Sequence, residues 1–266
     1  FADNGEYALG SSLSINGATC FSISAKNVTL NCLGFNITGN NSANAYGIYS
    51  NGFNTTIKNC NINNFTIGVY FSGATNGTIQ KVVSNSTIAG GSGILLGSAS
   101  SGNTIAFSTG ISSASYGIYI SSSFNNAVLN STGITSTGYG IYLNNTAKNT
   151  LINFTGTALT TGIGIFLTFS PNNTIINSIG TSTSNIGLWL NNSHNNTIFN
   201  STGNSSSSSG ISFTGSINNT INGSRGNSST GYGVHLQSSS NSNIFINSTF
   251  ASVSNTSLNI TSSSNN

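Results

Sequence analysis

The residues that could carry out acid–base or metal chemistry are few and widely separated in this chain of 266 residues. Hydrolysis of a glycosidic bond needs two carboxylates flanking that bond, but the only carboxylates are Asp3 and Glu6, near the N-terminus. His194 and His235 have no acidic neighbour that would complete a Ser-His-acid triad, and they form no cluster of metal ligands. We therefore predict that the chain is not an enzyme and that it uses no cofactor or metal.

The three cysteines, Cys20, Cys32 and Cys60, all lie in the first quarter of the chain. A disulfide there would pin one end of an elongated protein, which otherwise frays from its ends. We favour a Cys20–Cys32 bridge. The competing pair is Cys32–Cys60, because Asn31-Cys32 and Asn59-Cys60 occupy equivalent places. The remaining cysteine is then buried as a small apolar residue or bonded to another molecule.

The low charge of the chain excludes several classes of partner. Only 3% of the residues are charged, and the net charge of +3 comes from five scattered basic residues, so no basic cluster could neutralise several phosphates of a nucleic acid. No apolar run approaches the length of a membrane span. The chain begins at Phe1 and contains no Met, so we expect a processed or truncated form.

Asn-x-Ser/Thr sequons are frequent along this charge-poor chain, which is typical of a glycoprotein at the outer surface of an archaeal or eukaryotic cell. Attached glycans would provide the hydration that charged side chains usually provide. We therefore predict an extracellular protein carrying covalent N-glycans. The candidate sites are the sequons in predicted turns and loops: Asn36, Asn40, Asn76, Asn144, Asn172, Asn191, Asn195, Asn204, Asn218 and Asn227.

Two short motifs recur in phase along the chain and define its architecture. A glycine followed by an aliphatic residue returns every 21 to 25 residues, and a Thr-Ile-like pair keeps the same step. The glycine pairs are Gly47-Ile48, Gly68-Val69, Gly93-Ile94, Gly117-Ile118, Gly140-Ile141, Gly164-Ile165, Gly187-Leu188, Gly210-Ile211 and Gly233-Val234. The Thr-Ile-like pairs run from Thr56-Ile57 to Asn243-Ile244. A unit of this size cannot bury an apolar face alone, so the repeats must stack on one another.

Stacked repeats of about 23 residues predict an all-β, single-domain, right-handed parallel β-helix of roughly nine or ten coils. Each repeat has room for two or three short strands, whereas a four-stranded propeller blade needs roughly 40 residues or more. Gly, Ser, Asn and β-branched residues disfavour helices. We expect an N-terminal cap with the first coil or coils over 1–45, regular coils over 46–250, and a terminal strand with a polar tail over 251–266.

Alternation along the strands assigns side chains to the inside or the outside. In the segment 139–143, we expect Tyr139, Ile141 and Leu143 inside and Tyr142 outside. In the segment 173–177, Ile175 is expected inside. A recurring asparagine is expected to turn inward at a corner and to form an amide ladder, which would exclude its members from glycosylation. That predicted ladder consists of Asn130, Asn153, Asn177 and Asn200.

The stretch from Cys20 to Gly39, CFSISAKNVTLNCLGFNITG, resembles the opening coil of NosD-like parallel β-helix proteins, which are common on archaeal surfaces. The segments 172–177 and 187–190 are similar to the repeats of that superfamily. The resemblance covers nearly the whole chain and implies the fold. It does not imply one function, because the superfamily spans lyases, hydrolases, epimerases and non-catalytic surface proteins.

Large apolar residues at outward positions form a predicted stripe along the solenoid. On the glycine-containing strand they are Tyr49, Tyr70, Leu95, Tyr119, Tyr142, Phe166 and Trp189. On the neighbouring strand they are Leu129, Ile152, Ile176 and Phe199, with Phe245 further on. Soluble monomers rarely expose a contiguous apolar patch of this size.

Several interpretations of the stripe remain open. The side chains could stack on one another and merely stiffen the exterior, or they could bind the sugar rings of an extracellular polysaccharide. An outward threonine column also suggests an ice-binding plane, although its neighbouring column is apolar. We favour burial against another copy, with the last coil left open to a further chain. The predicted function is the repeating subunit of a cell-surface filament or sheath, and the alternative is a carbohydrate-binding or adhesin module.

Overall fold

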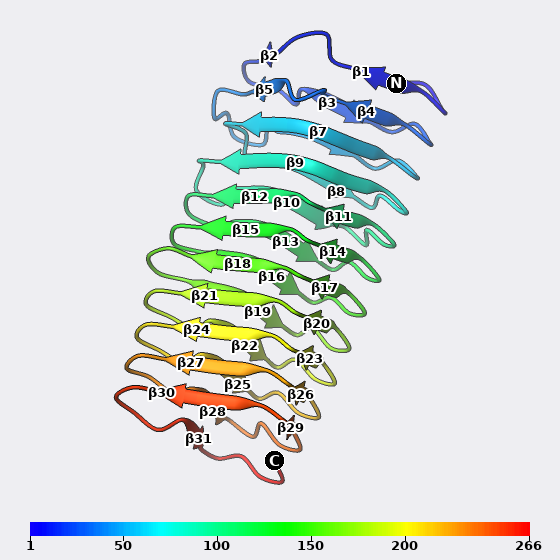
Figure 1. The fold of residues 1–266 in the computed structure, drawn as a ribbon. Helices are drawn as coiled ribbons and strands as arrows, with labels where there is room; N and C mark the ends of the chain where they lie inside the picture. Colours follow the sequence, from blue (N-terminus) through cyan, green and yellow to red (C-terminus); the bar gives the residue numbers. More distant parts are fainter.

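The computed structural model describes residues 1–266 as an all-β right-handed solenoid of eleven coils, with about 23 residues in each coil (Figure 1). Two sheets run the length of the solenoid, one of 20 strands and one of 11 strands. Each coil contributes a first and a second strand to the 20-stranded sheet and a third strand to the 11-stranded sheet. Neighbouring strands lie about 4.8 Å apart, so the ten steps between coils make the solenoid about 48 Å long. The predicted fold is confirmed, with eleven coils in place of nine or ten.

The third strands form the 11-stranded sheet, and every pairing in it is parallel. They are β3 (Phe21–Ile23), β6 (Tyr46–Ser50), β8 (Ile67–Ser72), β10 (Ser92–Gly97), β13 (Tyr116–Ser121), β16 (Tyr139–Asn144), β19 (Ile163–Thr168), β22 (Leu188–Asn191), β25 (Ile211–Thr214), β28 (Val234–Gln237) and β31 (Leu258–Ile260). The repeated glycine precedes or lies within these strands, which explains the most regular motif of the sequence.

The first and second strands make up the 20-stranded sheet and are separated by a short bend. The first strands are β1 (Glu6–Ala8), β4 (Thr29–Asn31), β11 (Thr104–Ala106), β14 (Ala127–Leu129), β17 (Thr150–Ile152), β20 (Thr174–Ile176), β23 (Thr197–Phe199), β26 (Thr220–Asn222) and β29 (Ile244–Ile246). The second strands are β2 (Leu13–Ser14), β5 (Asn36–Thr38), β12 (Thr109–Ser112), β15 (Thr132–Thr135), β18 (Thr155–Ala158), β21 (Ile179–Ser182), β24 (Thr202–Ser205), β27 (Arg225–Ser228) and β30 (Thr249–Ser252). In two coils a single long strand runs through the bend, namely β7 (Thr56–Asn63) and β9 (Thr78–Ser86).

The N-terminal segment continues the stack of coils. β1 pairs in parallel with β4, and β2 pairs with β5, so residues 6–14 form the first two strands of a coil. A first coil therefore begins within residues 1–45, the segment expected to hold the cap and the first coil or coils, which accounts for part of the difference in coil number. At the other end, β31 lies in the segment 251–266, where a terminal strand was expected, and it pairs with β28.

Inward aliphatic side chains fill a continuous core, as the alternation predicted for Ile175, which is fully buried. Tyr139 was expected inside, and that prediction is wrong: its ring lies outside, against other aromatic rings. The reason is that, next to Tyr139, the backbone of β16 packs directly against the backbone of β18 in the other sheet. A Cβ atom on Gly140 would lie 2.5 Å from the Thr157 nitrogen of the facing strand. The interior therefore has no room for the side chain that precedes this glycine.

In the last coil, β29 pairs with β26 in a register that differs by one residue from the one the Thr-Ile motif predicts. Ile244 lies opposite Thr220, and Phe245 lies opposite the buried Ile221. Phe245 was expected outside, but its ring packs against the core and contacts Phe213 edge to face, with the ring centroids 5.9 Å apart. The Asn243-Ile244 pair is therefore not the equivalent of the earlier Thr-Ile pairs, because the coil that ends there is one residue longer.

A buried asparagine ladder exists, but on a different line from the predicted one. The amide of Asn126 illustrates it: both its backbone N–H and its Nδ2 donate to Oδ1 of Asn149, at 2.9 and 3.1 Å. The members of this ladder are Asn103, Asn126, Asn149, Asn173, Asn196, Asn219 and Asn243, all at most 1% exposed. Its hydrogen bonds satisfy backbone groups that the corner would otherwise leave buried without partners.

The asparagines predicted for the ladder form the opposite bend and are exposed. Asn130, Asn153, Asn177 and Asn200 have φ between 45° and 52°, the left-handed region that asparagine tolerates better than most residues. The small or aromatic residue that follows each of them turns inward, as Ser131 and Phe154 do. Asparagine is therefore used at both corners, once for its side-chain amide and once for its backbone conformation.

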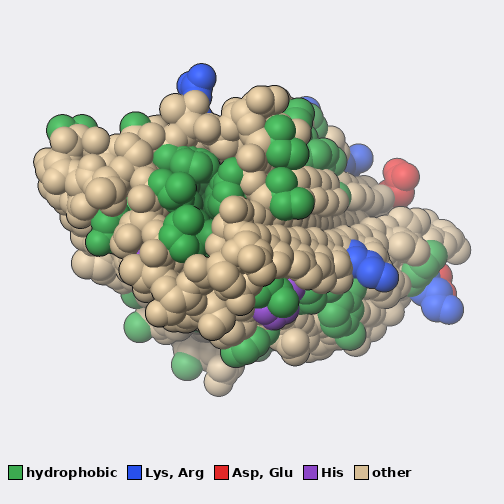
Figure 2. Space-filling view, turned by 90° about the horizontal axis from the view of Figure 1, so that it is seen from below, with side chains coloured by type: hydrophobic (Ala, Val, Ile, Leu, Met, Phe, Trp, Pro, Cys, Tyr) green, Lys and Arg blue, Asp and Glu red, His purple; other side chains and the backbone are tan.

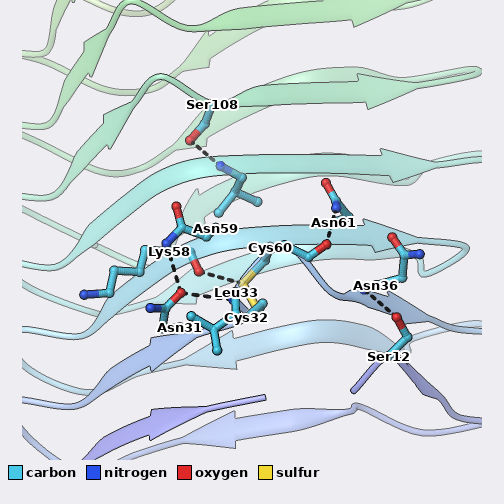
Figure 3. The surroundings of a disulfide bond; sticks show 12 residues. Ser12, Asn31, Cys32, Leu33, Asn36, Lys58, Asn59, Cys60, Asn61 and Ser108 are labelled. Atoms are coloured by element: carbon cyan, nitrogen blue, oxygen red, sulfur yellow. Dashed lines mark hydrogen bonds between the residues drawn. A yellow bond between two sulfur atoms is a disulfide. The ribbon is translucent and has the colours of Figure 1, made fainter. Parts of the chain in front are cut away.

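The disulfide joins Cys32 and Cys60, so the favoured Cys20–Cys32 bridge is wrong and the competing pair is confirmed (Figure 3). Both residues are buried at the same bend of adjacent coils, with their Cα atoms 4.8 Å apart. Beside them, Asn59 Nδ2 donates to Asn31 Oδ1 at 2.9 Å. Cys20 is half-buried against the core and free, since it precedes β3 on the other sheet. The chain contains no helix that could span a membrane.

Candidate functional site

The predicted outward column of the 11-stranded sheet is continuous. Each of its members lies directly opposite the next on the neighbouring strand, as Tyr119 does with Tyr142 and Phe166 does with Trp189. Each side chain is half-buried apart from Phe166, which is 5% exposed. The column comprises Tyr49, Tyr70, Leu95, Tyr119, Tyr142, Phe166 and Trp189. It spans six steps between strands, or about 29 Å.

The aromatic rings from Tyr119 to Trp189 in this column are stacked on one another along the solenoid axis, whereas Tyr49 and Tyr70 meet edge to face at 5.6 Å and 79°. The Tyr119 and Tyr142 ring centroids are 5.1 Å apart with 7° between their planes, and the values for Tyr142 and Phe166 are 5.1 Å and 6°. Trp189 continues the stack at 4.8 Å and 25° from Phe166. The faces of these rings therefore contact each other, and it is the ring edges that point to the surroundings.

A second outward column, which the sequence reasoning missed, runs beside the first on the same strands. It consists of the residue that precedes each repeated glycine, and it includes Tyr46, Ile67, Tyr116, Tyr139, Ile163 and Ile186. Tyr139 contacts both Tyr142 and Phe166, with each pair of centroids 4.9 Å apart. The signal was present as a recurrent large residue before the glycine, but simple alternation placed it inside. We call the two columns together the aromatic face.

The aromatic face carries no acidic or basic side chain. Burial raises the pKa of Tyr142, and the neighbouring phenols Tyr119, Tyr116 and Tyr139 raise it further, because adjacent phenolates would repel one another. Burial also raises the pKa of Tyr46, of Tyr116 and of Tyr139. The phenols of Tyr46, Tyr116, Tyr139 and Tyr142 are therefore neutral hydrogen-bond donors near pH 7. Beyond Trp189, burial lowers the pKa of His235 and favours its uncharged form.

The rest of the predicted stripe lies elsewhere. Leu129, Ile152, Ile176 and Phe199 do face outward, but they lie on first strands of the 20-stranded sheet. The expected single stripe is therefore two separate columns on two sheets, because a bend separates a third strand from the first strand of the next coil. Phe199, at 39% exposed, is more open than the residues of the aromatic face.

The structure distinguishes the predicted glycosylation sites by exposure. Asn36, Asn40, Asn76, Asn172, Asn195 and Asn218 are exposed. Asn144, Asn191, Asn204 and Asn227 are half-buried, and Asn144 Nδ2 donates to the Tyr119 hydroxyl at 3.2 Å. Asn130, Asn153 and Asn200 were excluded on account of the expected ladder, but they are exposed as well. That exclusion is corrected, since the ladder uses other asparagines.

The titratable residues of the chain do not converge on one site. Asp3 and Glu6 are exposed at the N-terminal end, and no group of three or more His, Cys, Asp or Glu side chains lies together in a way that could hold a metal ion. Seen from the C-terminal end in Figure 2, charged side chains are few. The feature with the greatest extent is thus the uncharged aromatic face.

Eleven stacked coils with two parallel sheets and inward ladders define a parallel β-helix. The profile of the right-handed β-helix region matches residues 133–266, and this chain belongs to that family. No curated protein has a matching sequence. Among solved structures, the chain is similar to the A-module of mannuronan C-5 epimerase AlgE6 from Azotobacter vinelandii, with a TM-score of 0.61 and 12% identity over 97% of this chain and 80% of that one.

The chain is also similar to the periplasmic alginate epimerase AlgG, with a TM-score of 0.51 and 12% identity over 98% of this chain and 76% of that one. These similarities correct the prediction that the chain is not an enzyme. Both solved structures are epimerases by name and have this coiled architecture over most of their length. A scarcity of carboxylates is therefore not a sufficient ground for placing a chain of this architecture outside the enzymes. At 12% identity, the property that they share with this chain is the fold.

Proposed function

We propose that this protein is an extracellular, N-glycosylated structural subunit whose aromatic face binds the aromatic face of a second copy. Repetition of this contact would build a filament or sheath at the cell surface. The Cys32–Cys60 disulfide supports an oxidising, extracellular environment. The exposed sequons, such as Asn172 and Asn195 at successive bends, would place glycans on surfaces that remain open to solvent.

The observation that carries this proposal is the continuous, uncharged aromatic face. Two copies could approach one another there without repulsion between like charges, and a two-fold contact needs only that the face complement itself. The rings are held in place before contact because they stack on each other, so little side-chain entropy would be lost on association. Removal of such a surface from water is favourable in proportion to its apolar area.

Polysaccharide binding on the same face is less well supported. A sugar ring packs best against the open face of an aromatic ring, but the faces of Tyr142 and Phe166 are each occupied by the neighbouring rings. The similar epimerases are named for alginate and for mannuronan, which are acidic polymers, whereas the aromatic face offers no cation to an acidic sugar. Self-association therefore fits this face better.

The test compares two triple variants of the glycosylated protein. In the first, Tyr119, Tyr142 and Trp189 of the aromatic face are replaced by serine. In the matched control, Leu129, Ile152 and Ile176 of the other outward column are replaced by serine. We expect the wild type and the control to form assemblies that are visible by electron microscopy and analytical ultracentrifugation, and the first variant to remain monomeric with an unchanged circular dichroism spectrum.

Two outcomes would contradict the proposal. One is a wild-type protein that stays monomeric at every concentration tested. The other is equal loss of assembly in both triple variants, which would mean that the aromatic face has no special part in the contact. Loss of polysaccharide binding in the first variant, at constant molecular mass, would support the carbohydrate-binding alternative in its place.

A further inference from the structure

The first strands of four successive coils present an apolar column on the 20-stranded sheet, away from the aromatic face (strands β14, β17, β20 and β23 in Figure 1). Its members lie directly opposite one another, and it ends where Ala106 and Asn222 take the same position. It consists of Leu129, Ile152, Ile176 and Phe199. We call it the first-strand column. Since all four side chains remain partly open to solvent, the column would give each copy a second apolar surface through which to associate.

Glycosylation sequons with accessible amides lie in the bends on both sides of this column. Asn172, Asn195 and Asn218 occupy the bend before the first strand in three successive coils, with φ of 56° or 57°. Asn130 and Asn200 occupy the bend after the first strand. All five side chains are exposed, and none of their Nδ2 atoms donates a hydrogen bond within the protein.

The other asparagines of the bend after the first strand are less suited to modification. Asn153 belongs to a sequon, but its Nδ2 donates to Asn130 Oδ1 at 2.9 Å. Asn177 is exposed but lies outside any sequon, because Ile179 follows two residues after it. The two suitable residues, Asn130 and Asn200, are therefore three coils or about 14 Å apart, which leaves room for a glycan on each.

We propose that N-linked glycans at these two bends cover the first-strand column and so restrict self-association to the aromatic face. The inference rests on the glycosylated subunit proposed above, and it adds which apolar surface the glycans close. At each site a bond forms between the asparagine Nδ2 and the anomeric carbon of the glycan. The bond from that carbon to the phosphate of an activated glycan donor breaks, the phosphate leaves, and Nδ2 loses one proton.

The first-strand column is narrow enough for such glycans to span. Each first strand is three residues long, or about 10 Å, and lies between the two bends. A glycan of several sugar residues is longer than this, so one attached at either bend reaches the column. Its hydrated bulk would keep a second protein surface away from Ile152 and Ile176.

The aromatic face lacks this arrangement. The bends that lead into β19 and β22, residues 159–162 and 183–187, contain no sequon. At the other end of these strands and their neighbours, the sequon residues Asn144 and Asn191 are half-buried, and Asn144 Nδ2 donates to the Tyr119 hydroxyl. One side of the aromatic face is therefore free of attachment sites, whereas the first-strand column has attachment sites on both sides.

Peptide mapping of the native glycoprotein by mass spectrometry tests the attachment sites. We expect glycans on at least one of the three asparagines in the bend before the first strands, and on Asn130 or Asn200 in the bend after them. A bend whose asparagines are all unmodified would overturn the proposal, whatever the occupancy of sequons elsewhere in the chain.

Association through the column is measured in the aromatic-face triple variant described above, so that the contact of the proposed function is absent. We expect this glycosylated background to be monomeric by analytical ultracentrifugation. Replacement of the five bend asparagines by glycine should at least double its weight-average mass, because the column is then uncovered. Glycine suits these bends, since Gly102 and Gly223 hold the equivalent positions of other coils with φ of 66° and 61°. Adding serine at Leu129, Ile152 and Ile176 should return the protein to a monomer.

The matched control is Asn36→Gln, which removes an exposed sequon in β5, before the column begins, and should leave the background monomeric. If the five-site variant does not fold, enzymatic trimming of the folded glycoprotein to one sugar at each site gives the same comparison. The proposal fails if the uncovered protein stays monomeric, or if the serine substitutions do not reverse its association. Neither result depends on whether the wild type assembles through the aromatic face, so failure of this inference is distinguishable from failure of the proposed function.

Discussion

At the scale of single residues, asparagine performs two separate tasks in the same coil. At one corner it turns inward and bonds to the next asparagine of the ladder, as Asn196 does with Asn219. At the other corner it adopts a left-handed backbone conformation and stays exposed, as Asn200 does. The sequence predicted an asparagine ladder but assigned it to the wrong column, since both columns recur with the same period. Which asparagine column turns inward depends on the backbone dihedral angles at the two corners, and the spacing of residues does not reveal these angles.

Replacement of Asn196 by alanine should destabilise the solenoid by about 2–4 kcal/mol. The change removes Oδ1 as acceptor for the backbone N–H of Asn173, at 2.7 Å, and leaves that N–H buried without a partner. It also removes the bond from Nδ2 to Asn219 at 3.1 Å. The measurement is urea denaturation followed by circular dichroism.

The matched control for this prediction is Asn200→Gly, in the exposed column. Glycine readily adopts the required positive φ, and Gly223 already occupies the equivalent position one coil later, with φ of 61°. We expect this variant to differ from the wild type by less than about 1 kcal/mol. Equal destabilisation by both substitutions would contradict the distinct roles of the two columns.

At the scale of secondary-structure elements, paired glycines set how closely the two sheets approach. A Cβ atom on Gly164 would lie 2.6 Å from the carbonyl carbon of Gly180, and one on Gly140 would lie 2.8 Å from the carbonyl carbon of Gly156. This contact excludes Tyr139 from the interior and so produces the second column of the aromatic face. Strand alternation predicted Tyr142 and Ile175 correctly. It failed at Tyr139 because the position of the facing strand is a property of the whole coil.

Alanine at Gly164 should separate the two sheets locally and cost about 2–4 kcal/mol. Its new methyl group would overlap backbone atoms of the facing strand, including Gly180 Cα at 2.7 Å, and backbone cannot rotate away as a side chain can. The measurement is the thermal unfolding midpoint, with Gly10→Ala as control, because a Cβ at Gly10 would meet no atom within 4 Å. A Gly164→Ala protein as stable as the control would show that the sheets can move apart freely.

At the scale of the whole molecule, the coil repeat was readable from the sequence because identical motifs must lie opposite one another in neighbouring coils. The parallel strands and the approximate coil length follow from that repeat. The disulfide could not be assigned in the same way. It depends on which bends of the first coils coincide.

The stability of the protein should depend on pH in two ranges, above pH 10 and below pH 6.5. The pKa values of Tyr116, Tyr139 and Tyr142 are raised above the ordinary 10.0 by burial in the folded state. Their contribution to stability is therefore fully present below pH 10 and is lost as the pH rises further, because the unfolded chain releases its phenolic protons first. Tyr142→Phe should reduce this alkaline loss.

At the acidic side, the pKa of His235 is lowered from 6.5 by burial. Its contribution is present above pH 6.5 and is lost as the pH falls, because the unfolded chain takes up the proton more readily. The measurement for both limbs is the unfolding midpoint as a function of pH, together with the ultraviolet absorbance of tyrosinate. An alkaline limb that is the same in Tyr142→Phe and in the wild type would contradict the role given to the aromatic face.

Because each coil is bonded only to the coils before and after it, the molecule has the mechanics of a spool of thread. Tension between its two ends would unwind it from a free end, one coil at a time. Each released coil of about 23 residues would add about 80 Å of slack. The Cys32–Cys60 bond ties two turns of the thread together, so unwinding from the N-terminal side stops there. If the molecule assembles as proposed, the assembly would lengthen in steps under load and need not break.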